Sequence, residues 1–146
     1  MKKSLLFYII ITLLIGGLPS IFVYMNDTYN SLNKPFLAPP GIIFPIVWTI
    51  LFILMAISIY RVNKVTDYNC IYFLQLIINA LWTPIFFGLN NYLLALIWLI
   101  LLIITVCIML YKFYKENKTS FYLNIPYLIW LLFALYLNAG IYILNK

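Results

Sequence analysis

Five apolar runs, each long enough to cross a lipid bilayer as a helix, constrain this chain more than any other feature. They cover residues 4–25, 41–62, 69–89, 92–114 and 121–144. A helix needs about 20 mostly apolar residues to cross about 30 Å of hydrocarbon. We therefore predict an all-α integral membrane protein in which residues 1–146 form a single domain, a bundle of five transmembrane helices.

The composition excludes a water-soluble fold of this size. Hydrophobic residues make up 66% of the chain and charged residues 8%, whereas soluble domains are about half apolar and a quarter charged. The fourth run is the most apolar, with thirteen Leu, Ile or Val residues between Leu93 and Leu110. We expect this helix to face lipid, with Trp98 on its lipid side.

The basic residues predict how the chain is oriented. With the N-terminus inside, seven basic residues lie on the cytoplasmic side: Lys2, Lys3, Arg61, Lys64, Lys112, Lys115 and Lys118. Only Lys34 and Lys146 lie outside. The positive-inside rule therefore predicts an inside N-terminus and an outside C-terminus. We expect the membrane to be a bacterial cell membrane. The net charge of +6 reflects this topology and contact with anionic lipid, and we expect no nucleic-acid partner.

Missing residue types limit the chemistry. The chain has no histidine, which excludes histidine-based acid–base catalysis, histidine metal sites and histidine-ligated haem. The acids Asp27, Asp67 and Glu116 all fall at predicted membrane edges, which argues against proton-coupled transport. Cys70 and Cys107 lack metal-ligand spacing. We expect no metal site and no required cofactor.

Polar and aromatic residues share one face of the third run. Gln75, Asn79, Trp82 and Phe86 are spaced four, three and four residues apart, which places them on one stripe of a helix. Amides avoid hydrocarbon, so we expect this stripe to point inward. Two interpretations remain open: hydrogen bonding between helices, or a polar group in an aromatic-lined ligand cavity.

The fifth and second runs carry similar faces. The face in the fifth run consists of Tyr127, Trp130, Ala134 and Asn138, after Pro126 in the first helical turn. The face in the second run consists of Phe44, Trp48, Phe52, Met55 and Ile59. Such stripes serve either packing or a pocket. Three of them in one small bundle favour a pocket.

The connection at residues 26–40 is long and rich in Asn, Pro and Tyr. It is either a plain connector or a lid over a binding site. Its candidate lid residues are Tyr29, Lys34, Pro35, Pro39 and Pro40. The first run also contains a small-xxx-small pair, Gly16 and Ser20, which we interpret as close packing inside one bundle.

Four segments carry a family resemblance. Residues 29–40 (YNSLNKPFLAPP) are similar to Y-x-x-L-x-K-P-x-W-x-P-P, and residues 44–49 (FPIVWT) to F-P-x-V-W-T. Residues 75–87 follow Q-L-x-x-N-x-x-W…F-F, and residues 126–138 follow P-Y-x-x-W…F-A…L-N. In this order on a five-span chain, they resemble the TspO/tryptophan-rich sensory protein family. That family includes the mitochondrial translocator protein, also called the peripheral-type benzodiazepine receptor.

The resemblance implies a five-helix bundle, commonly a homodimer, with a pocket beneath the first loop that binds flat hydrophobic molecules. Family ligands are porphyrins and, in animals, isoquinoline carboxamides and sterols. The absence of histidine makes metal-free protoporphyrin IX the expected ligand. The resemblance and the stripes together give these candidate ligand-binding residues: Trp48, Phe52, Asn79, Trp82, Phe86, Trp130, Ala134 and Asn138. Leu37 replaces the family's loop tryptophan, and Phe52 replaces its usual tyrosine.

The function expected from this resemblance is tetrapyrrole binding in sensing, stress response or tetrapyrrole handling. Two alternatives remain open. One is an enzyme that degrades porphyrin in a light- and oxygen-dependent reaction. The other is a small-molecule transporter or a scaffold that regulates a partner.

Overall fold

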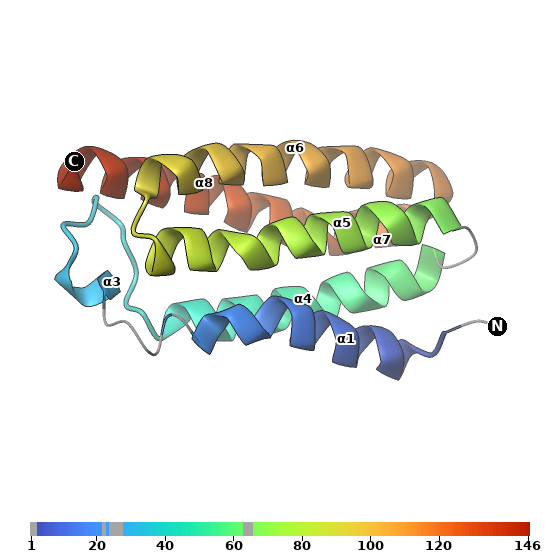
Figure 1. Ribbon diagram of the computed structural model, residues 1–146. Helices are drawn as coiled ribbons and strands as arrows, with labels where there is room; N and C mark the ends of the chain where they lie inside the picture. The colour runs from blue at the N-terminus through green and yellow to red at the C-terminus, as the bar shows by residue number, and fades with distance from the viewer. Residues whose placement is uncertain (1–2, 22, 24–27, 63–65) are drawn as a thin grey trace.

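The computed structural model describes residues 3–21, 23, 28–62 and 66–146, and within these ranges every regular element is helical. Figure 1 shows the helices along the chain. They are α1 (Leu5–Gly17) with a 3-10 turn η1 (Leu18–Ser20), α3 (Thr28–Ser31), α4 (Ile43–Val62), α5 (Thr66–Thr83) with a π-helical turn η2 (Pro84–Gly88), α6 (Tyr92–Glu116), α7 (Lys118–Leu123) and α8 (Ile125–Asn145).

The predicted membrane-embedded helical bundle is confirmed, but its count of five crossings is not. Four stretches are long and apolar enough to cross a membrane: Ile43–Val62, Tyr68–Gly88, Tyr92–Glu116 and Lys118–Asn145. The apolar helix Leu5–Ser20 is shorter. Residues 22 and 24–27, where the first run was predicted to end, lie outside the described residues, as do Lys2 and Lys64.

The helices form a ring of neighbours. Helix α1 packs on α4 and α5, α5 packs on α6, and α6 packs on α8. The short helix α7 closes the ring by contacting α4, α6 and α8. The start of α1 and the C-terminus lie at opposite ends of the bundle, and α3 with its loop lies at the C-terminal end (Figure 1). Tyr29 and Leu32 of this region pack against Phe86, Ala95 and Ile141, so a site beneath the loop lies among the ends of α4, α5 with η2, α6 and α8.

Polar side chains fasten the helices at the end away from the loop. Tyr8 of α1 donates a hydrogen bond to Asn69 of α5, with an O···O distance of 2.7 Å. Ser58 and Ser120 each donate to the other's backbone carbonyl, at 3.0 and 2.9 Å. Asn124, fully buried at the start of α8, also donates to Ser120. In lipid such bonds contribute to helix association, because burying apolar surface provides little drive there.

The prediction that Trp98 faces lipid is wrong. Its indole nitrogen donates to the carbonyl of Ile78 on α5 at 2.8 Å, and its ring packs against the core. Helix α6 buries one face against the bundle and exposes the other. The sequence does not predict which face of α6 is buried, because a helix composed almost entirely of Leu and Ile has no amphipathic pattern.

The close approach of α1 to α4 depends on Gly16. A Cβ atom added at Gly16 would lie 2.6 Å from Cε1 of Phe52, whereas one added at Gly17 would meet nothing within 4 Å. The ring of Phe52 stacks on Trp48, with 5.3 Å between the ring centroids, and so has little room to yield. The predicted packing role inside one bundle is confirmed for Gly16 but not for Ser20, which is exposed and donates its hydroxyl to the carbonyl of Gly17 in its own segment.

We predict that Gly16→Ala lowers stability and Gly17→Ala does not. Overpacking a well-filled interior costs about 1–3 kcal/mol, whereas an unobstructed glycine-to-alanine change in a helix gains about 0.5–1 kcal/mol. Thermal unfolding of both variants in one detergent measures the difference. Equal melting temperatures would show that α1 and Phe52 are not tightly packed.

Candidate functional site

A buried polar chain joins α5 to α8 at the centre of the bundle. Asn79 Nδ2 donates to the hydroxyl of Tyr127 at 2.7 Å, and this hydroxyl donates to Gln75 Oε1 at 2.8 Å. All three side chains are buried, which confirms that the stripes of the third and fifth runs point inward. Gln75 Nε2 has no hydrogen-bond partner among the described residues.

A second polar link lies nearer the loop. Trp82 Nε1 donates to Asn138 Oδ1 at 3.1 Å, and Asn138 Nδ2 donates to the carbonyl of Tyr92 at 3.0 Å. The ring of Trp82 also stacks on that of Phe86, at 4.9 Å between centroids. The amide of Asn138 thus ties α5, α6 and α8 together. This geometry favours a packing role for Trp82, Phe86 and Asn138, whose predicted contact with a ligand stays a prediction.

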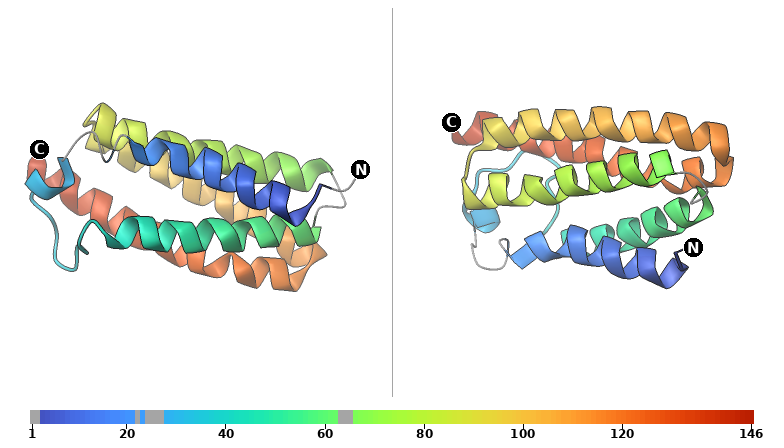
Figure 2. Two further views of the ribbon diagram at one scale, coloured as in Figure 1. Left: turned by 90° about the horizontal axis from the view of Figure 1, so that it is seen from below. Right: turned by 45° about the vertical axis from the view of Figure 1, so that its right-hand side comes forward.

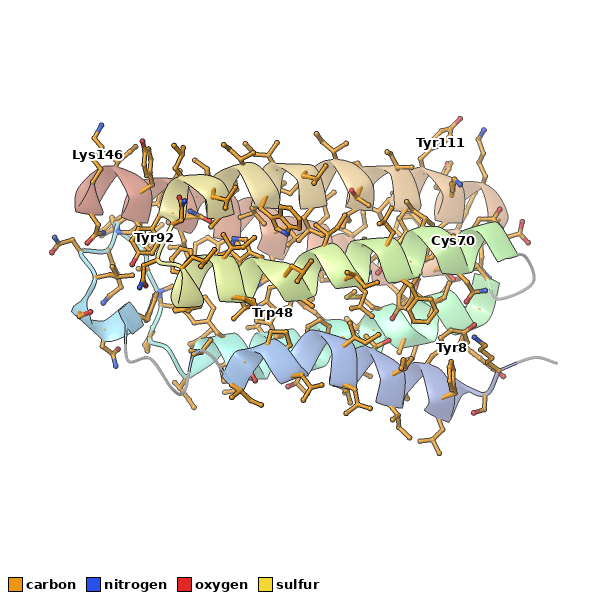
Figure 3. The ribbon with its side chains drawn as sticks, viewed as in Figure 1. Tyr8, Trp48, Cys70, Tyr92, Tyr111 and Lys146 are labelled. Atoms are coloured by element: carbon orange, nitrogen blue, oxygen red, sulfur yellow. The ribbon has the colours of Figure 1, made fainter. Side chains whose placement is uncertain are left out.

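Aromatic rings run from the loop into the bundle. Tyr29 meets Phe44 edge to face at 5.2 Å, and Phe44 meets Trp130 in the same way at 5.9 Å. One helical turn below Phe44, Trp48 contacts Tyr127 at 6.1 Å between centroids. Figure 3 labels Trp48, with Tyr8 and Lys146 toward the two ends of the bundle.

The predicted residues Trp48, Asn79 and Trp130 are therefore brought near one another, through intermediates. Trp48 and Asn79 both contact Tyr127. Trp130 joins them through Phe44, which precedes Trp48 by one turn of α4. The stripes placed Tyr127 on the same helical face as Trp130, and Phe44 on the same face as Trp48. The sequence did not reveal that Tyr127 and Phe44 connect Trp48, Asn79 and Trp130.

The indole N–H of Trp130 is buried and has no hydrogen-bond partner among the described residues. The indole groups of Trp82 and Trp98 both donate, by contrast. Leaving a buried donor unpaired costs about 1–3 kcal/mol. Ala134, one turn further along α8, is only partly buried and carries the smallest side chain of this face. The N–H of Trp130 is thus a donor available to an acceptor that enters the bundle here.

The loop is closed by its own residues. The hydroxyl of Tyr29 donates to the carbonyl of Pro39 at 2.7 Å, and burial raises the pKa of this phenol, which keeps it neutral. Lys34 Nζ donates to the carbonyl of Tyr29 at 3.0 Å and lies 4.9 Å from the centre of its ring. Lys34 therefore has a structural role in the loop, whether or not it also meets a ligand.

The loop is also fastened to the last turns of α8. The backbone N–H of Asn33 donates to Asn145 Oδ1 at 3.0 Å, and Asn145 Nδ2 donates back to the carbonyl of Asn33 at 2.8 Å. Pro35 lies against Gly140, where an added Cβ would come within 2.6 Å of the proline ring. No motif in the sequence predicts these pairs, because they join residues more than a hundred positions apart.

Comparisons with known proteins agree on one family. The sequence profile described as the TspO/MBR family matches residues 8–144. The chain is 38% identical over 144 residues to "Tryptophan-rich protein TspO" of Archaeoglobus fulgidus, covering 94% of each. It is 36% identical over 124 residues to "Protein CrtK" of Rhodobacter capsulatus, covering 80% of this chain and 78% of that one. It is 34% identical over 116 residues to "Tryptophan-rich sensory protein" of Cereibacter sphaeroides, covering 77% and 73%.

Proposed function

The chain belongs to the TspO/MBR family, and on that premise we propose that it binds protoporphyrin IX, or a similar flat hydrophobic molecule, inside the helix bundle. The name of a relative, "Tryptophan-rich sensory protein", supports a sensing or regulatory role for such binding. The ligand meets the bundle beneath the loop of residues 28–42, where the aromatic row of Tyr29, Phe44 and Trp130 begins. Its binding requires no resident cofactor or metal.

The unpaired N–H of Trp130 is the observation that carries this proposal. A porphyrin combines a broad π-face with carboxylate acceptors at its edge. Phe44 and Trp130 supply rings for the face, each contributing about 0.5–1.5 kcal/mol beyond the burial of area. The indole N–H supplies a donor for an acceptor on the ligand, which relieves the cost of leaving it unpaired.

A titration tests the proposal directly. We expect protoporphyrin IX to quench the tryptophan fluorescence of the purified chain in nanodiscs, with saturation near one ligand per chain. Empty nanodiscs containing free N-acetyltryptophanamide are the control for partitioning and inner-filter effects. Quenching that rises linearly with ligand and matches this control would refute specific binding.

We also propose five crossings with the N-terminus inside. Arg61 is in the last turn of α4 and Lys115 in the last turn of α6, and both helices end on the side of the bundle opposite α3 (Figure 1). Lys34 belongs to the loop after α3, and Lys146 lies at the loop end of the bundle (Figure 3). This separation of charge fits the positive-inside rule.

Cysteine labelling in intact cells checks this topology. In a chain that lacks Cys70 and Cys107, a cysteine at Lys34 should react with a membrane-impermeant maleimide added outside. A cysteine at Lys118 should react only after permeabilisation. The reverse pattern would invert the assignment.

We propose a homodimer on the strength of the family alone. Gly16 does not argue for it, because its open face is filled by Phe52 of the same chain. Crosslinking in bilayers that recovers only monomer at every protein-to-lipid ratio would contradict the dimer.

A further inference from the structure

A strained turn in the loop displays two large apolar side chains. The backbone N–H of Ala38 donates to the carbonyl of Pro35 at 3.3 Å, which closes a four-residue turn over residues 35–38. Its third residue, Leu37, has a φ of 73°. This left-handed conformation normally requires glycine or asparagine. The loop thus holds a leucine in a conformation that its backbone disfavours.

Both central side chains of the turn point away from the protein. Phe36 is 84% exposed and Leu37 is 67% exposed. In water this arrangement would leave adjacent large apolar groups hydrated, at a turn position where small or polar residues are the usual choice. The exposure of both side chains therefore favours an apolar environment outside the chain.

The position of the turn identifies that environment. The hydroxyl of Tyr136 on α8 donates to the carbonyl of Phe36. Tyr136 precedes Asn145, the last residue of α8, by nine residues, or about 13 Å along the helix axis. The turn therefore lies well below the end of α8, and not above the bundle.

The two helices next to the turn, α8 that holds it and α4 that follows it in the chain, expose apolar side chains. On α8, Leu132 and Tyr136 are exposed on the outside of the bundle, and Ile42 and Ile46 are exposed before and within α4. Figure 2 (left) shows the chain between α3 and α4 bulging outward on the side of the bundle formed by α4 and α8. The turn thus continues the surface that these two membrane-crossing helices present to lipid.

We propose that the turn of residues 35–38 inserts Phe36 and Leu37 into the acyl–glycerol region of the leaflet on the loop side. Exposed apolar groups that continue a lipid-facing surface are suited to this region of a bilayer. The loop is then held at two places, by α8 through Asn33 and Pro35 and by lipid through Phe36 and Leu37. This inference does not depend on which ligand the bundle binds.

Spin labels measure the depth of the turn. In full-length chain lacking Cys70 and Cys107, reconstituted in phosphatidylcholine vesicles, a nitroxide is placed at Phe36 or at Leu37. Matched labels at Ile46, on the exposed side of α4, and at Asn30, exposed on α3, give the lipid and aqueous references. Power saturation then compares collisions with oxygen, which concentrates in lipid, and with the water-soluble nickel chelate NiEDDA.

We expect the oxygen-to-NiEDDA ratio at Phe36 and Leu37 to approach that at Ile46 and to exceed that at Asn30. A ratio equal to that at Asn30 at both positions would place the turn in water and overturn the proposal. Low accessibility to both reagents would also overturn it, because it would place the turn against protein and not against lipid. Labelling at two positions guards against disruption of the turn by either label.

Discussion

Replacing Trp130 by alanine is expected to weaken protoporphyrin IX binding by roughly 5- to 150-fold, or about 1–3 kcal/mol. The substitution removes the ring that Phe44 contacts and the only indole group shown to be buried without a partner among the described residues. Trp130→Phe separates the two contributions, because it keeps a ring and deletes the donor. We expect its effect to fall between those of the parent and Trp130→Ala.

The matched control is Leu132→Ala, which truncates an exposed side chain on the same helix. It should leave the affinity unchanged. Trp98 is unsuitable as a lipid-facing control because it bonds to Ile78. If Trp130→Ala folds normally and binds protoporphyrin IX as tightly as the parent, the ligand does not contact Trp130, and the aromatic row serves packing only.

Replacing Tyr127 by phenylalanine is expected to destabilise the bundle strongly for the loss of a single atom. It removes the hydroxyl that accepts from Asn79 and donates to Gln75, and so leaves two buried amides short of a partner. Hydrogen bonds between membrane helices average about 0.6 kcal/mol and reach about 1.7 kcal/mol. The loss of two of them should therefore cost about 1–3 kcal/mol.

Unfolding in mixed micelles with rising SDS measures this cost. Tyr122→Phe provides the control, because it makes the same chemical change at an exposed position. Asn79→Leu removes the other partner of the hydrogen bond between Asn79 and Tyr127. The double variant with Tyr127→Phe should lose less stability than the sum of the losses in the two single variants. Strict additivity would mean that Asn79 and Tyr127 do not interact.

The sequence predicted the inward faces well because each carried a mark of its direction. An amide in an apolar run must avoid lipid, so Gln75 and Asn79 indicated which side of α5 is buried. The apolar run of helix α6 has no amide that would indicate its buried face, and the orientation of Trp98 was predicted wrongly. Its position depends on the carbonyl of Ile78, which a sequence does not reveal.

The arrangement of the loop was also beyond the sequence. Its composition suggested a lid. Its attachment depends on the space beside Gly140, where the ring of Pro35 packs, and on the hydrogen bonds between Asn145 and the backbone of Asn33. These contacts are long-range and join residues without any motif between them. Lys34 illustrates the same limit, because only the structure shows that its ammonium group binds carbonyl groups of its own loop.

The most direct test of the account is the indole N–H signal of Trp130, measured by ¹⁵N–¹H NMR of nitrogen-labelled tryptophan in nanodiscs. Tryptophan-to-phenylalanine variants assign the four indole signals. If an acceptor on the ligand pairs with the indole N–H of Trp130, adding protoporphyrin IX should shift the signal of that indole proton downfield at saturation. The ring-current contribution of the porphyrin is subtracted, using the shifts of nearby protons that form no new hydrogen bond. The signal of Trp98, already bonded to Ile78, should move little. A Trp130 signal that stays in place while protoporphyrin IX saturates the protein would contradict the proposed site.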